Sequence, residues 1–189
     1  MAEPIRCFIA FDINNDKALK KLSDAQSKLT DTGADLKCVR PENIHITVRF
    51  LGSIRPEVVN SVHSEMERAS FAPFDVKIRG VGVFPTIKYA RVVWAGIQEG
   101  AEELRQIFNQ LEPGLRRLGL KSDVKGFSPH ITIARVRTGR NREGLLRCLE
   151  ELRDYEFGVL RVDCLKLKKS VLTPRGPMYS TLKEVCRQN

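Results

Sequence analysis

The chain has 189 residues and carries 32 Lys and Arg against 23 Asp and Glu, a net charge of +9 at pH 7. This length suits one domain with its own core, and the positive charge favours a polyanionic partner such as RNA, DNA or a phosphorylated small molecule. Five cysteines without a Cys-x-x-Cys spacing indicate reduced thiols in a cytoplasm, and argue against a disulfide framework and a zinc site.

The first half of the chain alternates strand-like and helix-like patterns. Apolar residues that alternate or cluster indicate strands, and apolar residues spaced three or four apart indicate helices. Gly33 is a plausible end for the first helix. In chain order the patterns predict strand, helix, strand, helix and strand, over residues 5–11, 18–29, 45–48, 58–69 and 74–79.

The second half repeats this series, with Pro113-Gly114 predicted to kink its first helix. Strand, helix, strand, helix and strand are predicted over residues 91–97, 104–118, 130–133, 145–152 and 157–162. A last strand follows over 178–185, after the turn at 173–177. We interpret the chain as an α+β protein of two pseudo-symmetric β-α-β-β-α-β halves, with antiparallel sheets around a central cleft in a single domain over 1–189.

Each half holds one copy of the same tetrapeptide, His45-Ile46-Thr47-Val48 and His130-Ile131-Thr132-Ile133, and these use two of the three histidines. Alternate side chains of a strand share a face, so His and Thr point together into one space while the aliphatic residues enter a core. A pseudo-twofold arrangement places His45 and His130 across one cleft. The alternative is two independent lobes, each with its histidine packed against its own lobe.

Two facing imidazoles suit phosphodiester chemistry. One can deprotonate an incoming oxygen while the other protonates the leaving oxygen, and an unperturbed pKa of ~6.5 suits both tasks. The Thr47 and Thr132 hydroxyls can donate to phosphate oxygens. The residues lack a ligand cluster for a dedicated metal centre, so this pattern predicts metal-independent phosphoester chemistry, with a bell-shaped pH profile near neutrality.

The contexts of the two motifs resemble the two-histidine (2H) phosphoesterases, and among them the RNA 2′,3′-cyclic phosphodiesterases, also called 2′-5′ RNA ligases. The matching segments span nearly the whole chain: Phe8-Ile9-Ala10, Arg40-Pro41-Glu42-Asn43-Ile44, Phe50-Leu51-Gly52, Phe84-Pro85, Arg91-Val92-Val93-Trp94, Phe127-Ser128-Pro129, Ala134-Arg135-Val136 and Leu172 to Tyr179. The resemblance implies the bilobal LigT-like fold. It also implies that His45 is the proton donor and His130 the proton acceptor, with Thr47 and Thr132 orienting the phosphate.

The resemblance further assigns substrate-binding positions. Arg135 matches an arginine near the substrate phosphate, although five positions after His130 a regular strand turns it to the opposite face, so a bulge or strand end is required. Arg49 stands where the family commonly has Lys, and it is expected to share the face of His45 and Thr47. Phe8 and Tyr179 are assigned to the cleft wall, with core packing as the alternative for both.

Two further residues are expected outside the site, His63 on a helix surface and Lys168 as a remote surface charge. The activity implied is hydrolysis of RNA 2′,3′-cyclic phosphate ends to 2′-phosphates. The alternatives are ligation or cleavage of 2′-5′ linkages in tRNA halves, and a non-catalytic RNA-binding module. We expect a monomeric cytoplasmic protein without a cofactor, acting on RNA ends, including tRNA fragments, or on nucleotides. No apolar run approaches a membrane span, and the first residues do not resemble a signal peptide.

Overall fold

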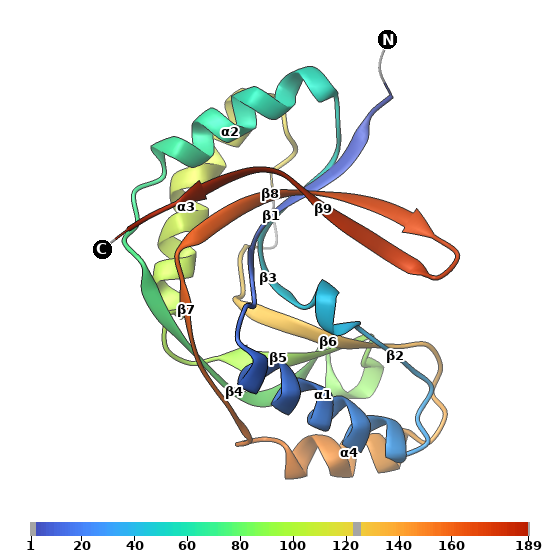
Figure 1. Ribbon diagram of the computed structural model, residues 1–189. Helices are drawn as coiled ribbons and strands as arrows, with labels where there is room; N and C mark the ends of the chain where they lie inside the picture. Colours follow the sequence, from blue (N-terminus) through green and yellow to red (C-terminus); the bar gives the residue numbers. More distant parts are fainter. Residues whose placement is uncertain (1–2, 123–125, 189) are drawn as a thin grey trace.

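A computed structural model describes residues 3–122 and 126–188, which form two antiparallel sheets with helices on their outer sides (Figure 1). The first sheet has the order β3-β1-β8-β9. Its strands are β1 (Ile5–Asp12), β3 (His45–Ile54), β8 (Cys164–Thr173) and β9 (Gly176–Cys186). The second sheet has the order β2-β6-β5-β4-β7. Its strands are β2 (Leu36–Cys38), β4 (Phe74–Phe84), β5 (Val92–Ile97), β6 (His130–Val136) and β7 (Glu156–Val162).

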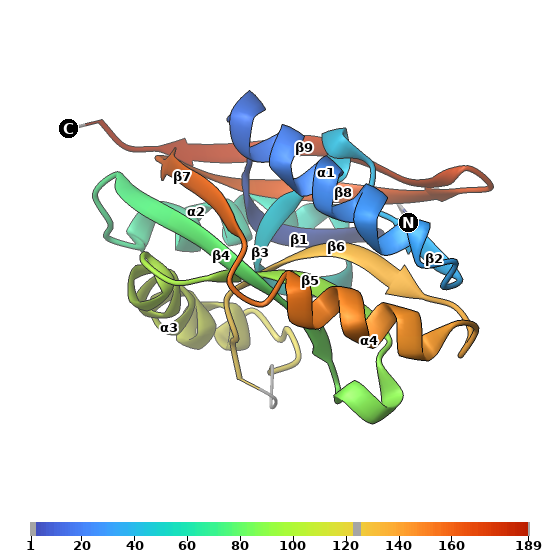
Figure 2. The same ribbon diagram turned by 90° about the horizontal axis from the view of Figure 1, so that it is seen from below.

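The helices are divided between the two sheets. Helices α1 (Asp16–Asp31) and α4 (Arg142–Glu151) pack together beside the second sheet, where α1 contacts β6 and β7 (Figures 1 and 2). Helices α2 (Val59–Arg68) and α3 (Ala101–Arg117) pack together beside the first sheet, where α2 contacts β9 and α3 contacts β3. Three short 3-10 turns are η1 (Pro41–Asn43), η2 (Pro56–Val58) and η3 (Ile87–Tyr89). Among the described residues, no helix combines the length and the apolar composition needed to cross a lipid bilayer.

The predicted amphipathic patterns agree with the observed burial. Ala18, Leu22, Ala25 and Leu29 are at most 1% exposed along one face of α1. Asn15 caps this helix, because its side chain accepts a hydrogen bond from the Ala18 amide at 3.0 Å. The aliphatic residues of both His-x-Thr-x motifs are buried in the hydrophobic core, as predicted. These are Ile46, Val48, Ile131 and Ile133.

Each sheet is built from both halves of the sequence. Strands β8 and β9 come from the second half and extend the sheet of β1 and β3, while β2 and β4 come from the first half and join β5, β6 and β7. Helix α1 likewise leaves β1 and packs beside the second sheet. The hypothesis of two independent lobes is therefore wrong, because neither sheet is complete without elements from the other half.

The α+β fold with two antiparallel sheets agrees with the prediction, and the first half follows the order β-α-β-β-α-β. Among the described residues, the second half runs β-α-β-α-β-β-β instead. Strand β8 was not predicted. Its Lys166 and Lys168 interrupt the expected apolar pattern, and both lysines pair with Asp12 of β1, more than 150 positions earlier.

The prediction of reduced thiols is wrong for one pair of cysteines. Cys164 begins β8 and Cys186 ends β9, and they form a disulfide with 4.0 Å between their Cα atoms. The register of the hairpin places the two residues directly opposite each other. Spacing in the sequence could not show this, because the pair depends on where the hairpin turns. Cys7, Cys38 and Cys148 are free thiols.

Candidate active site

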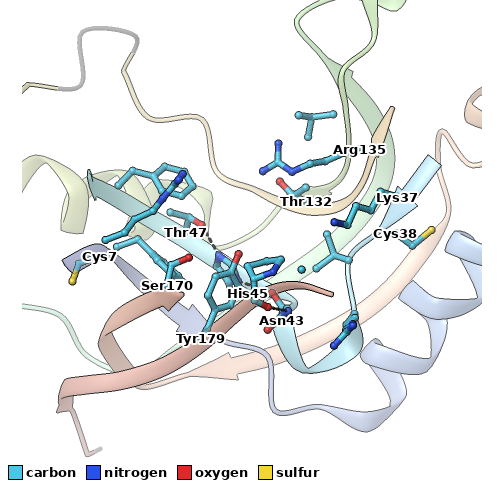
Figure 3. Close-up of a pocket in the computed structure, with 18 of the residues that line it drawn as sticks. Cys7, Lys37, Cys38, Asn43, His45, Thr47, Thr132, Arg135, Ser170 and Tyr179 are labelled. Carbon is cyan, nitrogen blue, oxygen red and sulfur yellow. Dashed lines mark hydrogen bonds between the residues drawn. The ribbon is translucent and has the colours of Figure 1, made fainter. Parts of the chain in front are cut away.

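A cleft of about 590 Å³ lies between the two sheets and brings both motifs together. His45 and Thr47 reach it from β3, and His130 and Thr132 reach it from β6. Figure 3 shows Thr132 and Arg135 on one side of this space and His45 and Thr47 on the other. One titratable ring and one hydroxyl therefore come from each sheet.

Both imidazoles are held in the same way. The Nδ1 of His45 lies 2.7 Å from the carbonyl oxygen of Asn43, and the Nδ1 of His130 lies 2.7 Å from that of Ser128. A carbonyl can only accept, so Nδ1 carries a hydrogen in each ring and Nε2 is the nitrogen that exchanges protons. The Nε2 of His45 is 2.8 Å from the Thr47 hydroxyl, which can donate to the neutral ring.

Aromatic rings lie beside both histidines. The ring centroids of Phe8 and Tyr179 are 4.8 Å and 5.4 Å from that of His45, and the centroid of Phe84 is 4.9 Å from that of His130. Burial lowers the pKa of His45 to about 4, with Lys168 contributing and the Asn43 carbonyl opposing. Burial also lowers the pKa of His130. Both rings are therefore mostly neutral at pH 7 when the cleft is empty.

A β-bulge follows the threonine in each motif. In β3, Thr47 is opposite Ala10 and Arg49 is opposite Ile9, so Val48 is the extra residue. In β6 the extra residue is Ile133. Each bulge reverses the alternation, so that the fifth residue after each histidine returns to the cleft. Arg135 accordingly lines the cleft, by the bulge that the sequence argument required.

The same bulge removes Arg49 from the cleft, so the prediction that it shares the face of His45 and Thr47 is wrong. Arg49 is 5% exposed, and its Nε donates to Glu112 of α3 at 2.7 Å. It also donates to the carbonyl oxygens of Phe50 and Lys121. Phe50 takes the place predicted for Arg49, because it lines the cleft and is 56% exposed.

Phe8 and Tyr179 both line the cleft, and their ring centroids are 4.9 Å apart. Phe8 is only 3% exposed, so it serves the core and the cleft wall together. Burial raises the pKa of the Tyr179 hydroxyl, while Arg135 and Arg6 oppose this shift. The hydroxyl thus stays protonated near neutral pH and can donate a hydrogen bond.

Lys168 is not the remote surface charge that was expected. It is 8% exposed and donates to Asp12, which also accepts from Lys166 at 3.0 Å. Asp12 is opposite His45 in the pairing of β1 with β3. Burial opposes the change, but hydrogen bonds from both lysines hold the pKa of Asp12 below its ordinary value. His63 lies on α2 outside the cleft, with 24% of its side chain exposed, as expected.

Further cations line the cleft, among them Lys37 and Arg40 from the segment that precedes the first motif. Arg6 and Arg175 were not assigned to it, although Arg175 lies in the segment that carried the family resemblance. Phe50 and Phe84 were not assigned to the cleft either, although both stand in segments that carried the family resemblance, Phe50-Leu51-Gly52 and Phe84-Pro85. Across residues 3–122 and 126–188, His, Cys, Asp and Glu side chains form no group of three that could hold a metal.

The chain is similar to known proteins over most of its length. A model described as LigT-like phosphoesterase matches residues 13–94 and matches again over residues 96–179. A protein of Aeropyrum pernix named RNA 2′,3′-cyclic phosphodiesterase is 38% identical over 165 residues, covering 87% of this chain and 94% of that protein. One of the same name from Methanothermobacter thermautotrophicus is 34% identical, covering 94% and 96%.

Solved structures show the same fold. A Thermus thermophilus protein superimposes with a TM-score of 0.80 at 28% identity, over 96% of this chain and 97% of that one. The structure of Escherichia coli LigT complexed with 3′-AMP gives a TM-score of 0.78 at 22% identity, over the full length of both chains.

Proposed function

The chain belongs to the LigT-like phosphoesterases, and from this membership we propose that it hydrolyses RNA 2′,3′-cyclic phosphate ends to 2′-phosphate ends without a metal. The single observation that carries the proposal is the pair of imidazoles in one cleft, each with Nδ1 bound to a carbonyl and Nε2 left for proton transfer. The names of the relatives supply the class of ester.

In the proposed reaction, His130 takes a proton from water through Nε2 while the water oxygen attacks phosphorus. The bond between phosphorus and the 3′-oxygen breaks, and His45 protonates that oxygen through Nε2. The products are a 2′-phosphomonoester and a free 3′-hydroxyl. His45 must be charged for this step, and the bound phosphate anion favours its charged form. Two aligned proton transfers of this kind are each worth about 10²-fold or more in rate.

The remaining groups stabilise the phosphate in this scheme. The hydroxyls of Thr47 and Thr132 donate to its non-bridging oxygens, where charge accumulates in the transition state. Arg135 supplies a guanidinium from the end of β6, and the Tyr179 hydroxyl is a further donor on the opposite wall. Phe8 holds the His45 and Tyr179 rings in place.

The residues that line the cleft also bear on the class of substrate, the oligomeric state and the place of action. The lining cations suit an RNA end, including a tRNA fragment, or a nucleotide. One chain supplies both histidines, which supports action as a monomer. An RNA substrate supports a cytoplasmic site of action, whereas the bonded Cys164–Cys186 pair gives that assignment no support.

The test uses an oligoribonucleotide ending in a 2′,3′-cyclic phosphate, incubated with the protein in EDTA. Products are compared by mass and retention with synthetic 2′-phosphate and 3′-phosphate standards. We expect only the 2′-phosphate, at a rate that EDTA does not change. His45→Ala and His130→Ala should each lower kcat by about 10²-fold or more and leave substrate affinity within a few-fold.

His63→Ala is the matched control, because it removes the one histidine that lies outside the cleft, and its kcat should remain normal. Circular dichroism establishes that each variant is folded. A near-normal kcat in a folded His45→Ala or His130→Ala protein would remove the paired-histidine mechanism. An activity that needs a divalent ion would contradict metal independence.

A further inference from the structure

A second hollow of about 170 Å³ lies beside the end of the catalytic strand β6. It is formed by η3, by the loop that joins β6 to α4 and by the start of α4, which are neighbours in Figure 2. Five of its lining residues are basic and none is acidic. These basic residues are Lys88, Arg91, Arg137, Arg140 and Arg142, and we call this site the basic hollow.

The basic hollow also presents apolar side chains to solvent. Ile87 and Tyr89 are 63% and 64% exposed. The turn that carries them is nevertheless ordered, since the Thr86 hydroxyl accepts from the Tyr89 amide at 3.3 Å and the Arg142 guanidinium donates to the Ile87 carbonyl at 3.4 Å. Lys88 lies 5.7 Å from the centre of the Tyr89 ring. An exposed aromatic ring among cations is the combination that binds single-stranded nucleic acid, by base stacking and phosphate contact.

The basic hollow lies next to the catalytic cleft, because neighbouring residues of the same segments line the two spaces. Arg135 lines the cleft near the end of β6, and Arg137, two residues further along the chain and just beyond that strand, lines the basic hollow. On β5, Val92 is paired with Arg135 and lines the cleft, while Arg91 next to it lines the basic hollow. A chain that leaves the phosphate at Arg135 thus meets this surface next.

We propose that the basic hollow binds the RNA strand that leads away from the cyclic phosphate, so that the protein acts on oligoribonucleotides better than on mononucleotides. This inference rests on the proposed function, because it takes the cleft as the site of the RNA end. Charge and position argue for this occupant: the five basic residues, of which Arg137 also lies 4.0 Å from Asp35, favour a polyanion, and the polyanion that enters the cleft lies next to this surface.

The first experiment measures binding by fluorescence anisotropy, with a labelled ten-nucleotide single-stranded RNA at several salt concentrations. Arg137→Ala/Arg140→Ala should weaken binding about tenfold and reduce the slope of log affinity against log salt by about 1.4, since each single-strand phosphate contact contributes about 0.7. Tyr89→Ala should weaken binding by about fivefold or more, and Tyr89→Phe should restore it. The control Arg105→Ala/Arg153→Ala removes the same charge from exposed positions elsewhere and should change affinity less than twofold.

The second experiment compares kcat/KM for a nucleoside 2′,3′-cyclic phosphate with that for a ten-nucleotide RNA ending in the same group. Arg137→Ala/Arg140→Ala should lower kcat/KM only for the longer substrate. An equal loss on both substrates, or unchanged RNA binding in the variants, would overturn the inference. An equal loss of binding to polyglutamate would also overturn it in favour of an acidic protein partner. If the wild-type protein hydrolyses neither substrate, the proposed function fails, and the binding experiment still decides what the basic hollow binds.

Discussion

At the scale of single residues, His45 and His130 are oriented by the same kind of hydrogen bond. Each imidazole donates from Nδ1 to the carbonyl two residues before it, at Asn43 and Ser128. Because this bond is made by the backbone, the tautomer of each ring is set before any substrate arrives. What distinguishes His45 from His130 is then the environment of each ring. His45 has Phe8 and Tyr179 beside it and the buried Lys168–Asp12 pair behind it.

This environment predicts a pH dependence. In the free protein burial lowers the pKa of His45 to about 4 and also lowers that of His130 from its ordinary 6.5. A reaction that needs one charged and one neutral ring then has its kcat/KM maximum below about pH 6.5, with a decline on either side, and not near neutrality as the sequence alone suggested. The two apparent pKa values of this profile belong to the coupled pair of histidines and not to either ring alone.

The kcat profile should lie at higher pH, because the bound phosphate anion raises both histidine pKa values in the complex. Initial rates from pH 4 to 9, fitted separately for kcat and kcat/KM, check this. A kcat/KM maximum at pH 8 would contradict the burial argument.

Arg135 should behave unlike the histidines. A guanidinium beside the phosphate binds both the ground state and the transition state, so Arg135→Ala should raise KM about tenfold and also lower kcat. The KM effect should shrink at high salt. Steady-state kinetics at two salt concentrations measure it, with Arg105→Ala as the control at an exposed position on α3. Wild-type kinetics for Arg135→Ala would exclude the arginine from phosphate binding.

At the scale of elements, periodicity predicted the four helices and most strands, because each buries one apolar face and the spacing of those residues is visible in the sequence. It could not predict the two bulges, which depend on pairing with β1 and β5. The extra residue directly after each threonine, Val48 in β3 and Ile133 in β6, decides that Arg135 enters the cleft and Arg49 leaves it. Strand β8 and the disulfide were missed for the same reason, since their partners are distant in sequence.

The new position of Arg49 gives a prediction about stability. Arg49 links β3 to α3 through Glu112 in a largely buried pair, so Arg49→Met leaves a carboxylate with one partner fewer and should cost about 3 kcal/mol. Urea unfolding measures this cost, and kcat/KM of the folded variant should stay within a few-fold of wild type. The control Arg105→Met, at an exposed pair on the same helix, should change stability by less than about 0.5 kcal/mol. A raised KM with unchanged stability would instead indicate that Arg49 contacts the substrate in the cleft.

At the scale of the whole molecule, the exchange of strands and helices makes the two lobes depend on each other. The first sheet needs β8 and β9, and the second needs β2 and β4. The cleft lies between these sheets, so its shape requires both halves of the chain.

This dependence predicts one cooperative unfolding transition. Trp94 is the only tryptophan and lies in β5 of the second sheet, so its fluorescence reports that sheet, while far-ultraviolet circular dichroism reports both. The two signals should have the same urea midpoint, and a fragment of residues 1–98 should be unfolded alone. Separate midpoints, or a folded fragment, would show that the lobes are independent.

The place of β8 in the first sheet also affects how the protein is made. Strand β1 leaves the ribosome early, but its neighbour β8 ends at residue 173. At about 5 to 20 residues per second, roughly 10 to 30 s pass between the synthesis of β1 and the synthesis of β8, which covers one edge of β1. During this interval the apolar residues of β1, among them Phe8, Ile9 and Phe11, lack their final cover and are a natural target for chaperones. A chain released before residue 164 would lack β8 and β9, and with them the wall of the cleft that carries Tyr179, so its first sheet would stay incomplete and we expect it not to fold.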